Sequence, residues 1–68
     1  MKDLGINNKV IVSRDDDGMR LDNYLIKIIK GMPKSIIYRM IRKGEVRINS
    51  KRAKPRSRVH VNDTVRMP

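Results

Sequence analysis

The residues best suited to chemistry in this chain are the basic side chains between residues 32 and 52. Lysine binds phosphate oxygens as a point charge, and arginine can form two parallel hydrogen bonds with one phosphate group. A single acidic residue, Glu45, lies among them. This composition is typical of a surface that binds an anion. The basic residues are Lys34, Arg39, Arg42, Lys43, Arg47, Lys51 and Arg52.

The positive charge of the chain is concentrated in its second half. The 68 residues contain 17 Lys and Arg against 7 Asp and Glu, which gives a net charge of +10. Residues 1–30 hold six basic and five acidic residues, whereas residues 31–68 hold eleven and two. Such an uneven field attracts polyanions, and nucleic acid is the commonest polyanion in a cell. The sequence therefore predicts a protein that binds nucleic acid.

Residue types with catalytic or metal-binding chemistry are few. The chain has no cysteine, and its one histidine, His60, alternates with valines and is expected on the polar side of a strand. The acidic turn at residues 15–18 lacks the spaced ligands and the final glutamate of a calcium loop. Its carboxylates instead suit the positive end of the helix that follows. We therefore expect no catalytic residue, no metal site and no cofactor.

One triplet, Arg20-Leu21-Asp22, resembles the catalytic Arg-Leu-Asp of pseudouridine synthases, in which the aspartate is essential. In that family a Thr-Ser-Gly follows, whereas this chain continues Asn23-Tyr24-Leu25. Asp22 also has a structural explanation, because an acidic residue in the first turn of a helix interacts favourably with the helix dipole. The sequence favours this structural role, and catalysis by Asp22 is the enzyme alternative.

Two amphipathic helices are expected to position the basic residues. The first covers residues 19–30 and is followed by Gly31, which can end a helix with a positive φ. Pro33, at the first helical position, opens the second at residues 34–43, and Gly44 ends it. The apolar sides should pack on each other or on a sheet. They consist of Leu21, Tyr24, Leu25, Ile28 and Ile29 in the first helix, and Ile36, Ile37, Met40 and Ile41 in the second.

After Gly44 the apolar period changes to two, which predicts short strands. The fold class is therefore α+β: two packed helices followed by a small antiparallel sheet, with an N-terminal strand joining it. Residues 1–8 are expected to be a flexible tail, and residues 9–68 a single domain. The predicted strands are residues 9–13, 46–48, 51–53, 58–61 and 64–67, with turns at Asn49-Ser50 and Asn62-Asp63.

The helical period predicts one continuous phosphate-binding surface. Free backbone N–H groups at the start of the second helix, beside Lys34 and Ser35, favour phosphate. The polar face continues through Arg39, Arg42 and Lys43, and the turn at residues 49–52 should lie near the end of the same helix. With two tyrosines in the chain, a stacking platform is not expected. Tyr38 can either stack on a base or lie half-buried at the boundary of the core.

The order of these motifs resembles the S4-type RNA-binding domain over most of the chain. The resemblance rests on Arg20-Leu21-Asp22-x-Tyr24-Leu25, the Lys34-Ser35 helix start and the run from Ile41 to Asn49. In sequence, residues 18–25 and 31–49 are most similar to the N-terminal module of bacterial large-subunit ribosomal RNA pseudouridine synthases. Two departures are Pro33-Lys34, where the family has a serine before an arginine, and Asn62-Asp63, where it commonly has Gly-Asp.

The resemblance implies an alpha-L motif that docks structured ribosomal RNA in the cytoplasm. In the parent synthase this motif would be tethered to a catalytic domain, which these residues lack. The chain alone would then have no activity, and no membrane is involved. The alternatives are a helix-turn-helix-like DNA-binding domain and a domain that docks an acidic protein. The RNA-binding residues that the resemblance and the charge pattern together imply are Arg20, Lys34, Ser35, Tyr38, Arg39, Arg42, Lys43, Asn49, Lys51 and Arg52.

Overall fold

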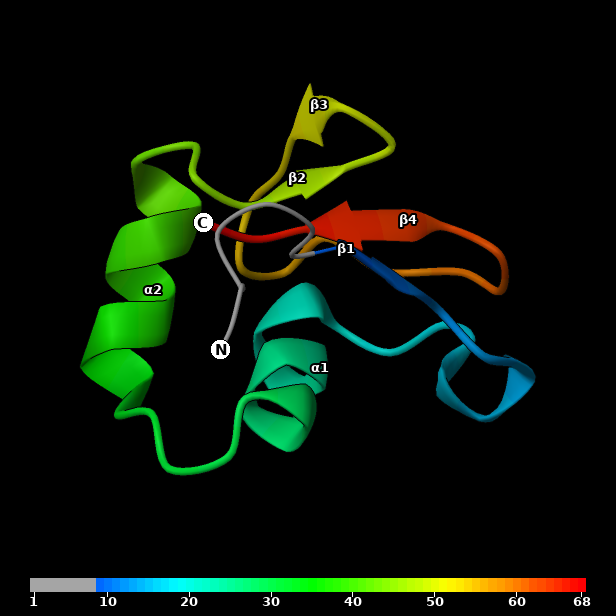
Figure 1. The fold of residues 1–68 in the computed structure, drawn as a ribbon, viewed down its shortest axis with the longest axis horizontal. Coiled ribbons are helices and arrows are strands. Elements are labelled where there is room, and N and C mark those ends of the chain that lie inside the picture. The colour runs from blue at the N-terminus through cyan, green and yellow to red at the C-terminus, as the bar shows by residue number, and fades with distance from the viewer. Residues whose placement is uncertain (1–8) are drawn as a thin grey trace.

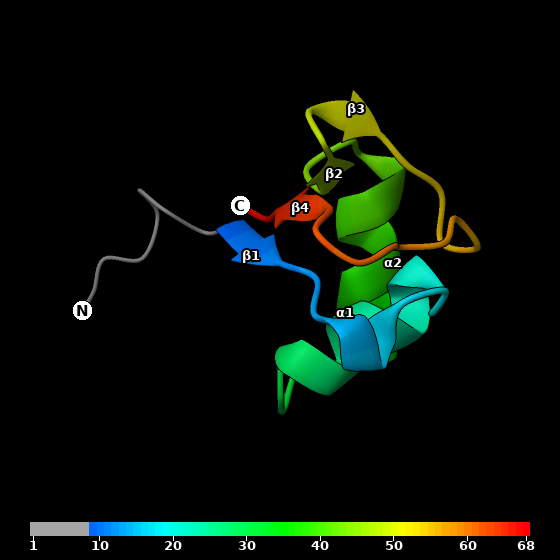
Figure 2. The same cartoon turned by 90° about the vertical axis from the view of Figure 1, so that its right-hand side faces the viewer.

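The computed structural model describes residues 9–68, so the predicted tail at residues 1–8 lies outside the described residues. It confirms the α+β class: two helices pack together beside one antiparallel sheet of strand order β1-β4-β2-β3, and the N-terminal strand is part of that sheet (Figures 1 and 2). The elements are β1 (Lys9–Ile11), the 3-10 helix η1 (Arg14–Asp16), α1 (Leu21–Ile28), α2 (Lys34–Arg42), β2 (Arg47–Ile48), β3 (Lys51–Arg52) and β4 (Thr64–Arg66).

The core lies between the helices and the inner side of the sheet. Each helix buries the apolar side that its period predicts, although Ile28, Ile29 and Ile36 are only partly buried. A fully buried aliphatic side chain contributes about 1.5–3 kcal/mol, so burial of this cluster is the main favourable contribution to folding. The buried residues are Leu21, Tyr24 and Leu25 from α1, Ile37, Met40 and Ile41 from α2, and Val12, Val46, Val59 and Val65 from strands and loops.

The first helix is shorter than predicted, because residues 18–20 pair with a distant segment. Gly18 donates a backbone hydrogen bond to the carbonyl of Val59, and Val59 donates one to the carbonyl of Met19. Arg20 forms an isolated bridge with Arg58. These contacts hold the backbone extended until Leu21. The second helix matches its predicted start, but Pro33 is its N-cap residue rather than its first helical residue.

The predicted strand at residues 58–61 is wrong. The backbone groups of this segment bond to loops instead of a strand. Val59 exchanges hydrogen bonds with Gly18 and Met19, and the Val61 N–H donates to the Asp17 side chain. Just before it, the carbonyls of Ser57 and Pro55 accept hydrogen bonds from the N–H groups of Leu21 and Asp22 at the start of α1. Val61 is 39% exposed, whereas the alternation placed it inside. His60 is exposed, as predicted.

The two predicted turns are present, and both use the left-handed region. Asn49 and Ser50 have φ values of 51° and 72°, as a two-residue hairpin between β2 and β3 requires. Asn62 has a φ of 73°. Asparagine tolerates this region better than most residues, so it can replace the glycine common in the family pattern.

Candidate nucleic-acid interface

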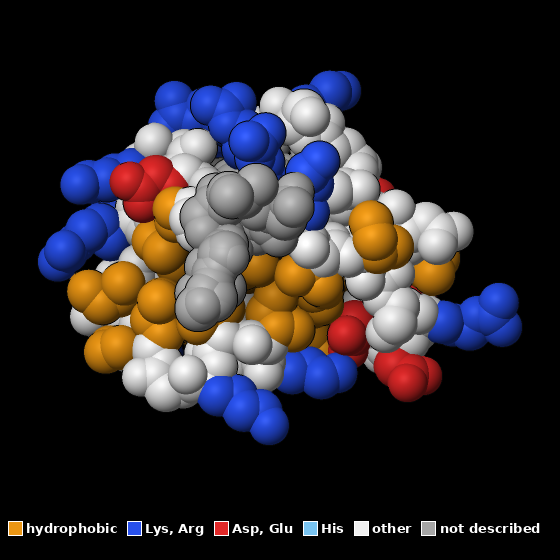
Figure 3. Space-filling model, in the orientation of Figure 1, with side chains coloured by type: hydrophobic (Ala, Val, Ile, Leu, Met, Phe, Trp, Pro, Cys, Tyr) orange, Lys and Arg blue, Asp and Glu red, His pale blue; other side chains and the backbone are white. Residues whose placement is uncertain are grey.

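The outer face of α2 is basic and free of acidic residues. Lys34, Ser35, Arg39, Arg42 and Lys43 are all exposed, as the helical period predicts. No side chain caps the N-terminus of α2, and its first turn contains no acidic residue. The partial positive charge of that helix end therefore adds to the charge of Lys34. Figure 3 shows Lys and Arg side chains beside the upper part of α2 and along the top of the molecule, over β2 and β3.

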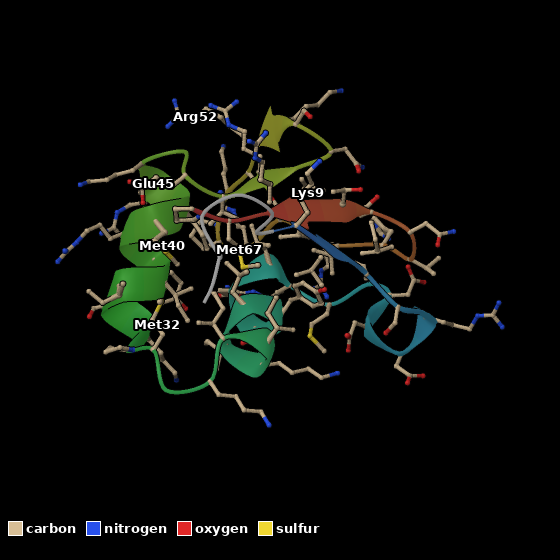
Figure 4. The ribbon with its side chains drawn as sticks, viewed as in Figure 1. Lys9, Met32, Met40, Glu45, Arg52 and Met67 are labelled. Atoms are coloured by element: carbon tan, nitrogen blue, oxygen red, sulfur yellow. The ribbon has the colours of Figure 1, made fainter. Side chains whose placement is uncertain are left out.

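Arg52 joins the hairpin to the end of α2. Its guanidinium Nη2 donates a hydrogen bond to the carbonyl oxygen of Arg42 at 3.1 Å, and the side chain extends over the helix end (Figure 4). It also passes so close to Gly44 that a Cβ atom there would lie 2.7 Å from Arg52 Nε. Gly44 has a φ of 77°, a conformation that favours glycine, and a Cβ atom there would displace the Arg52 guanidinium. The predicted proximity of this part of the hairpin to α2 is therefore confirmed.

The segment after β3 brings in basic residues that the sequence interpretation missed. Because Pro55 and Ser57 cap the start of α1, Lys54 and Arg56 lie beside Arg20. One groove of about 310 Å³ is lined by Arg20, Lys54, Pro55 and Arg56. A second groove of about 420 Å³ shares Lys54 and Pro55 and continues to Arg42 and Arg52. The available signal was the dense basic run at residues 51–58, of which only Lys51 and Arg52 were assigned to the binding surface from the sequence.

Arg20 is held in place by a buried carboxylate. Asp22 is 2% exposed, and its carboxylate accepts hydrogen bonds from Arg20 Nη2 at 2.9 Å, Tyr38 Oη at 3.0 Å and the backbone N–H of Asn23 at 2.8 Å. Burial acts to raise the pKa of Asp22, but the hydrogen bonds from Tyr38, Asn23 and Arg20 together outweigh it, so the pKa is lowered. Asp22 is therefore an ionised structural anchor that orients Arg20.

Tyr38 lies at the boundary between core and surface. Its side chain is partly buried, and its hydroxyl donates the hydrogen bond that links α2 to Asp22 in α1. The hydrogen bond to Asp22 raises the pKa of Tyr38, with burial adding to the shift. The hydroxyl is thus engaged in a hydrogen bond within the protein, and the side chain is half-buried, which is the boundary position that the sequence offered as one alternative.

Asn49 contacts β4 and the turn before it, whereas Arg52 contacts α2. The Asn49 side chain accepts a hydrogen bond from the Thr64 N–H at 2.9 Å and donates one to Asp63 at 2.9 Å. It therefore fastens the hairpin to β4. Lys51 is exposed on the edge strand β3.

The carboxylates of the acidic turn make contacts within the fold. Asp16 is buried and paired with Lys27, and this hydrogen bond raises the pKa of Lys27. Asp17 accepts a hydrogen bond from the Val61 N–H at 2.9 Å. The first N–H groups of α1 donate to the backbone carbonyls of Ser57 and Pro55 and not to these carboxylates. Among residues 9–68, no three His, Cys, Asp or Glu side chains are grouped to hold a metal ion.

Neither of the two helices in the described part of the chain is long and apolar enough to span a membrane.

Comparison with known proteins places these features in a family. The profile of the S4 domain matches residues 19–65. The chain is 48% identical to the ribosomal large subunit pseudouridine synthase C of Pasteurella multocida over 71 residues, which cover 98% of this chain and 22% of that protein. The enzymes of the same name from Haemophilus influenzae and Escherichia coli K12 are 53% and 51% identical over 84% and 87% of this chain, and 18% of each relative is covered.

This chain spans about a fifth of the length of the curated relatives it matches. No solved structure matches it. Nothing in these comparisons supports the helix-turn-helix alternative. The matched region contains both helices, the hairpin and the segment that caps α1. The chain therefore belongs to the S4 domain family, the family of RNA-binding modules that its sequence resembles.

Proposed function

We propose that this chain docks structured RNA, and specifically large-subunit ribosomal RNA, through the basic surface built by α2, β3 and residues 53–58. The observation that carries the proposal is the pair of connected grooves, which join Arg20 to Arg42 through shared lining residues. The names of the relatives, all ribosomal large subunit pseudouridine synthases, support the choice of RNA.

The surface favours recognition by charge and shape. Its cations lie on α2, at the N-cap of α1, on the hairpin and on a loop, so they can follow a phosphate backbone in more than one direction. Tyr38 offers the one aromatic ring face near them, since Tyr24 is buried. Phosphate contacts position a protein on nucleic acid without reading the base sequence. Affinity should therefore depend strongly on salt and weakly on the identity of single bases.

The binding residues that we propose are those predicted from the sequence, together with Lys54 and Arg56. Asp22 orients Arg20, so the guanidinium is pre-positioned before RNA arrives, which reduces the entropy lost on binding. Asn49 contributes by holding the hairpin against β4. Arg52 contributes from the end of α2.

We further propose that the chain acts as the RNA-binding module of a bacterial pseudouridine synthase and has no catalytic activity of its own. Asp22, the candidate from the sequence, is 2% exposed and hydrogen-bonded on both sides, which does not suit an attack on a uridine. In this arrangement the module would place a tethered catalytic domain near its target uridine. A cytoplasmic location follows from the proposed ribosomal RNA partner.

A competition measurement tests this function. A labelled transcript of a structured large-subunit ribosomal RNA segment is bound to the chain, and unlabelled RNA of the same sequence or duplex DNA of equal length is added. We expect the RNA to displace the label at a concentration at least ten times lower than the duplex DNA. Equal displacement by both polymers would contradict the proposal, because the charge would then be binding any polyanion.

A further inference from the structure

The outer face of the sheet carries a second row of positive charge, which shares Arg52 with the surface described above. The strand register places Lys9 opposite Arg66, Arg66 opposite Arg47, and Arg47 opposite Arg52, so each strand contributes one cation. All four side chains are exposed. The neighbouring positions Val10, Val65 and Ile48 turn inward. Figure 4 labels the two ends of the row, Lys9 and Arg52.

This arrangement is unfavourable for the isolated sheet. Like charges directly opposite each other on neighbouring strands destabilise the pairing. Within residues 9–68, no carboxylate lies within ion-pair distance of Lys9, Arg47 or Arg66. Arg52 has a partner, but it is the carbonyl of Arg42 and does not neutralise charge. The repulsion is therefore not relieved by the described part of the protein.

Protection of the sheet edges against pairing with another chain explains only two of the four cations in the row. Charged residues on edge strands discourage pairing with another chain. With the strand order β1-β4-β2-β3, that argument covers Lys9 and Arg52. It does not cover Arg66 on β4 or Arg47 on β2, since both strands are paired on each side. These two arginines need another explanation.

A polar pocket lies at one end of the row. It has a volume of about 290 Å³ and is lined by Lys9, Asn49, Ser50, Thr64 and Arg66. Two cations and three hydrogen-bonding side chains suit an oxyanion such as a phosphate group. Asp63, the acidic residue that contacts this region, is occupied by hydrogen bonds from Asn49 and the backbone of His60. With strands about 4.8 Å apart, the whole row is about 14 Å long, enough for several successive phosphates.

We propose that the outer face of the sheet is a second phosphate-binding surface, which holds a segment of RNA backbone other than the segment on α2 and residues 53–58. The two surfaces meet at Arg52, so one folded RNA can wrap from one to the other. The described residues of the row include no aromatic side chain, so the contact is to backbone and not to stacked bases. This inference rests on the proposed function, because it assumes that the polyanion is RNA.

The test compares three double variants that each remove two positive charges. R47Q/R66Q changes the two central strands, R39Q/R42Q changes α2, and R14Q/K30Q removes two exposed cations that belong to neither surface. The affinity for the labelled ribosomal RNA transcript is measured over a range of salt concentrations. We expect R47Q/R66Q to weaken binding at least tenfold and to reduce the log–log salt slope by about 1.4–1.8, since each lost phosphate contact removes about 0.7–0.9. R14Q/K30Q should change the slope by less than half as much.

The outcomes separate this inference from the proposed function. If R47Q/R66Q behaves like R14Q/K30Q while R39Q/R42Q loses affinity, the second surface is refuted and the first stands. If R39Q/R42Q also behaves like R14Q/K30Q, the proposed function itself fails. The charge-preserving variant R47K/R66K should retain affinity within threefold. Without RNA, R47Q/R66Q should unfold at the same temperature or higher at low salt, because repulsion is removed. A lower unfolding temperature would mean that the arginines stabilise the sheet and would overturn the proposal.

Discussion

Two regions of the proposed binding surface, α2 and residues 53–58, place their cations in different ways. In α2 the helical period determines which side chains face out, so Arg39 and Arg42 are exposed because Ile37 and Ile41 are buried. In residues 53–58 the backbone contacts determine it, because the carbonyls of Pro55 and Ser57 cap the start of α1 and thereby place Lys54 and Arg56 beside Arg20. A surface that arises from the helical period can be predicted from the sequence of that helix alone. A surface that arises from backbone capping depends on an element that is distant in the sequence.

The largest expected effect is on the core side of α2. Ile37 is fully buried, so Ile37→Ala should lower the free energy of unfolding by roughly 2–5 kcal/mol, through lost burial and the cavity left behind. Denaturant unfolding measures this change. Ile11→Ala is the matched control, because Ile11 is 58% exposed and its truncation should change stability little. Equal losses for the two variants would contradict the assigned core.

Gly44→Ala tests the junction between α2 and the hairpin. The left-handed backbone should cost about 1–2 kcal/mol for a residue with a Cβ. The new methyl would also displace the Arg52 guanidinium and weaken RNA binding. Gly31→Ala separates the two effects, since Gly31 has a φ of 85° but open space around its Cβ position. Both variants should unfold at a lower temperature than the unchanged chain. Only Gly44→Ala should also bind RNA more weakly, measured at a temperature where both variants are folded. Matching RNA affinities would refute the role of Arg52.

Neutralising each region separately tests whether they form one surface. One double variant carries Lys54→Gln and Arg56→Gln, and the other carries Arg39→Gln and Arg42→Gln. Each should reduce the log–log slope of RNA affinity against salt concentration by up to about 1.4–1.8, because each removes up to two phosphate contacts. Neither pair should change the unfolding midpoint, since all four side chains are exposed. An effect from the α2 pair alone would restrict the interface to the helix.

The smallest expected effect concerns the anchor that connects both regions. The lowered pKa of Asp22 means that its ionised form stabilises the fold. This contribution is present above the ordinary carboxyl pKa and is lost as pH falls through the lowered value. Tyr38→Phe removes one hydrogen bond to Asp22, so its pKa should rise and acid unfolding should begin at a higher pH. Circular dichroism across an acid titration measures this midpoint, and an unchanged midpoint would contradict the anchor role.

The sequence predicts much of this structure where the pattern is local. The two helices, the antiparallel sheet and the Asn49-Ser50 hairpin follow from period and turn chemistry, and the structure contains all of them. The start of α1 and the absence of a strand at residues 58–61 could not be predicted, because both depend on hydrogen bonds between segments about 35 residues apart. Lys54 and Arg56 were missed for the same reason. The roles of Asp22 and Asn49 as internal anchors also appear only when their partners Tyr38 and Thr64 are in place.

The central claim is that RNA binds across α2 and residues 53–58 together. The most direct test follows backbone amide chemical shifts of the labelled chain during titration with a structured large-subunit ribosomal RNA fragment, with duplex DNA as competitor. The account predicts shifts at Arg20, residues 34–43 and residues 51–56, joined by Lys9, Arg47 and Arg66 if the sheet face also binds, and these shifts should persist when DNA is added. Shifts of equal size at Arg14 and Lys30, which belong to neither surface, or shifts abolished by DNA, would contradict it.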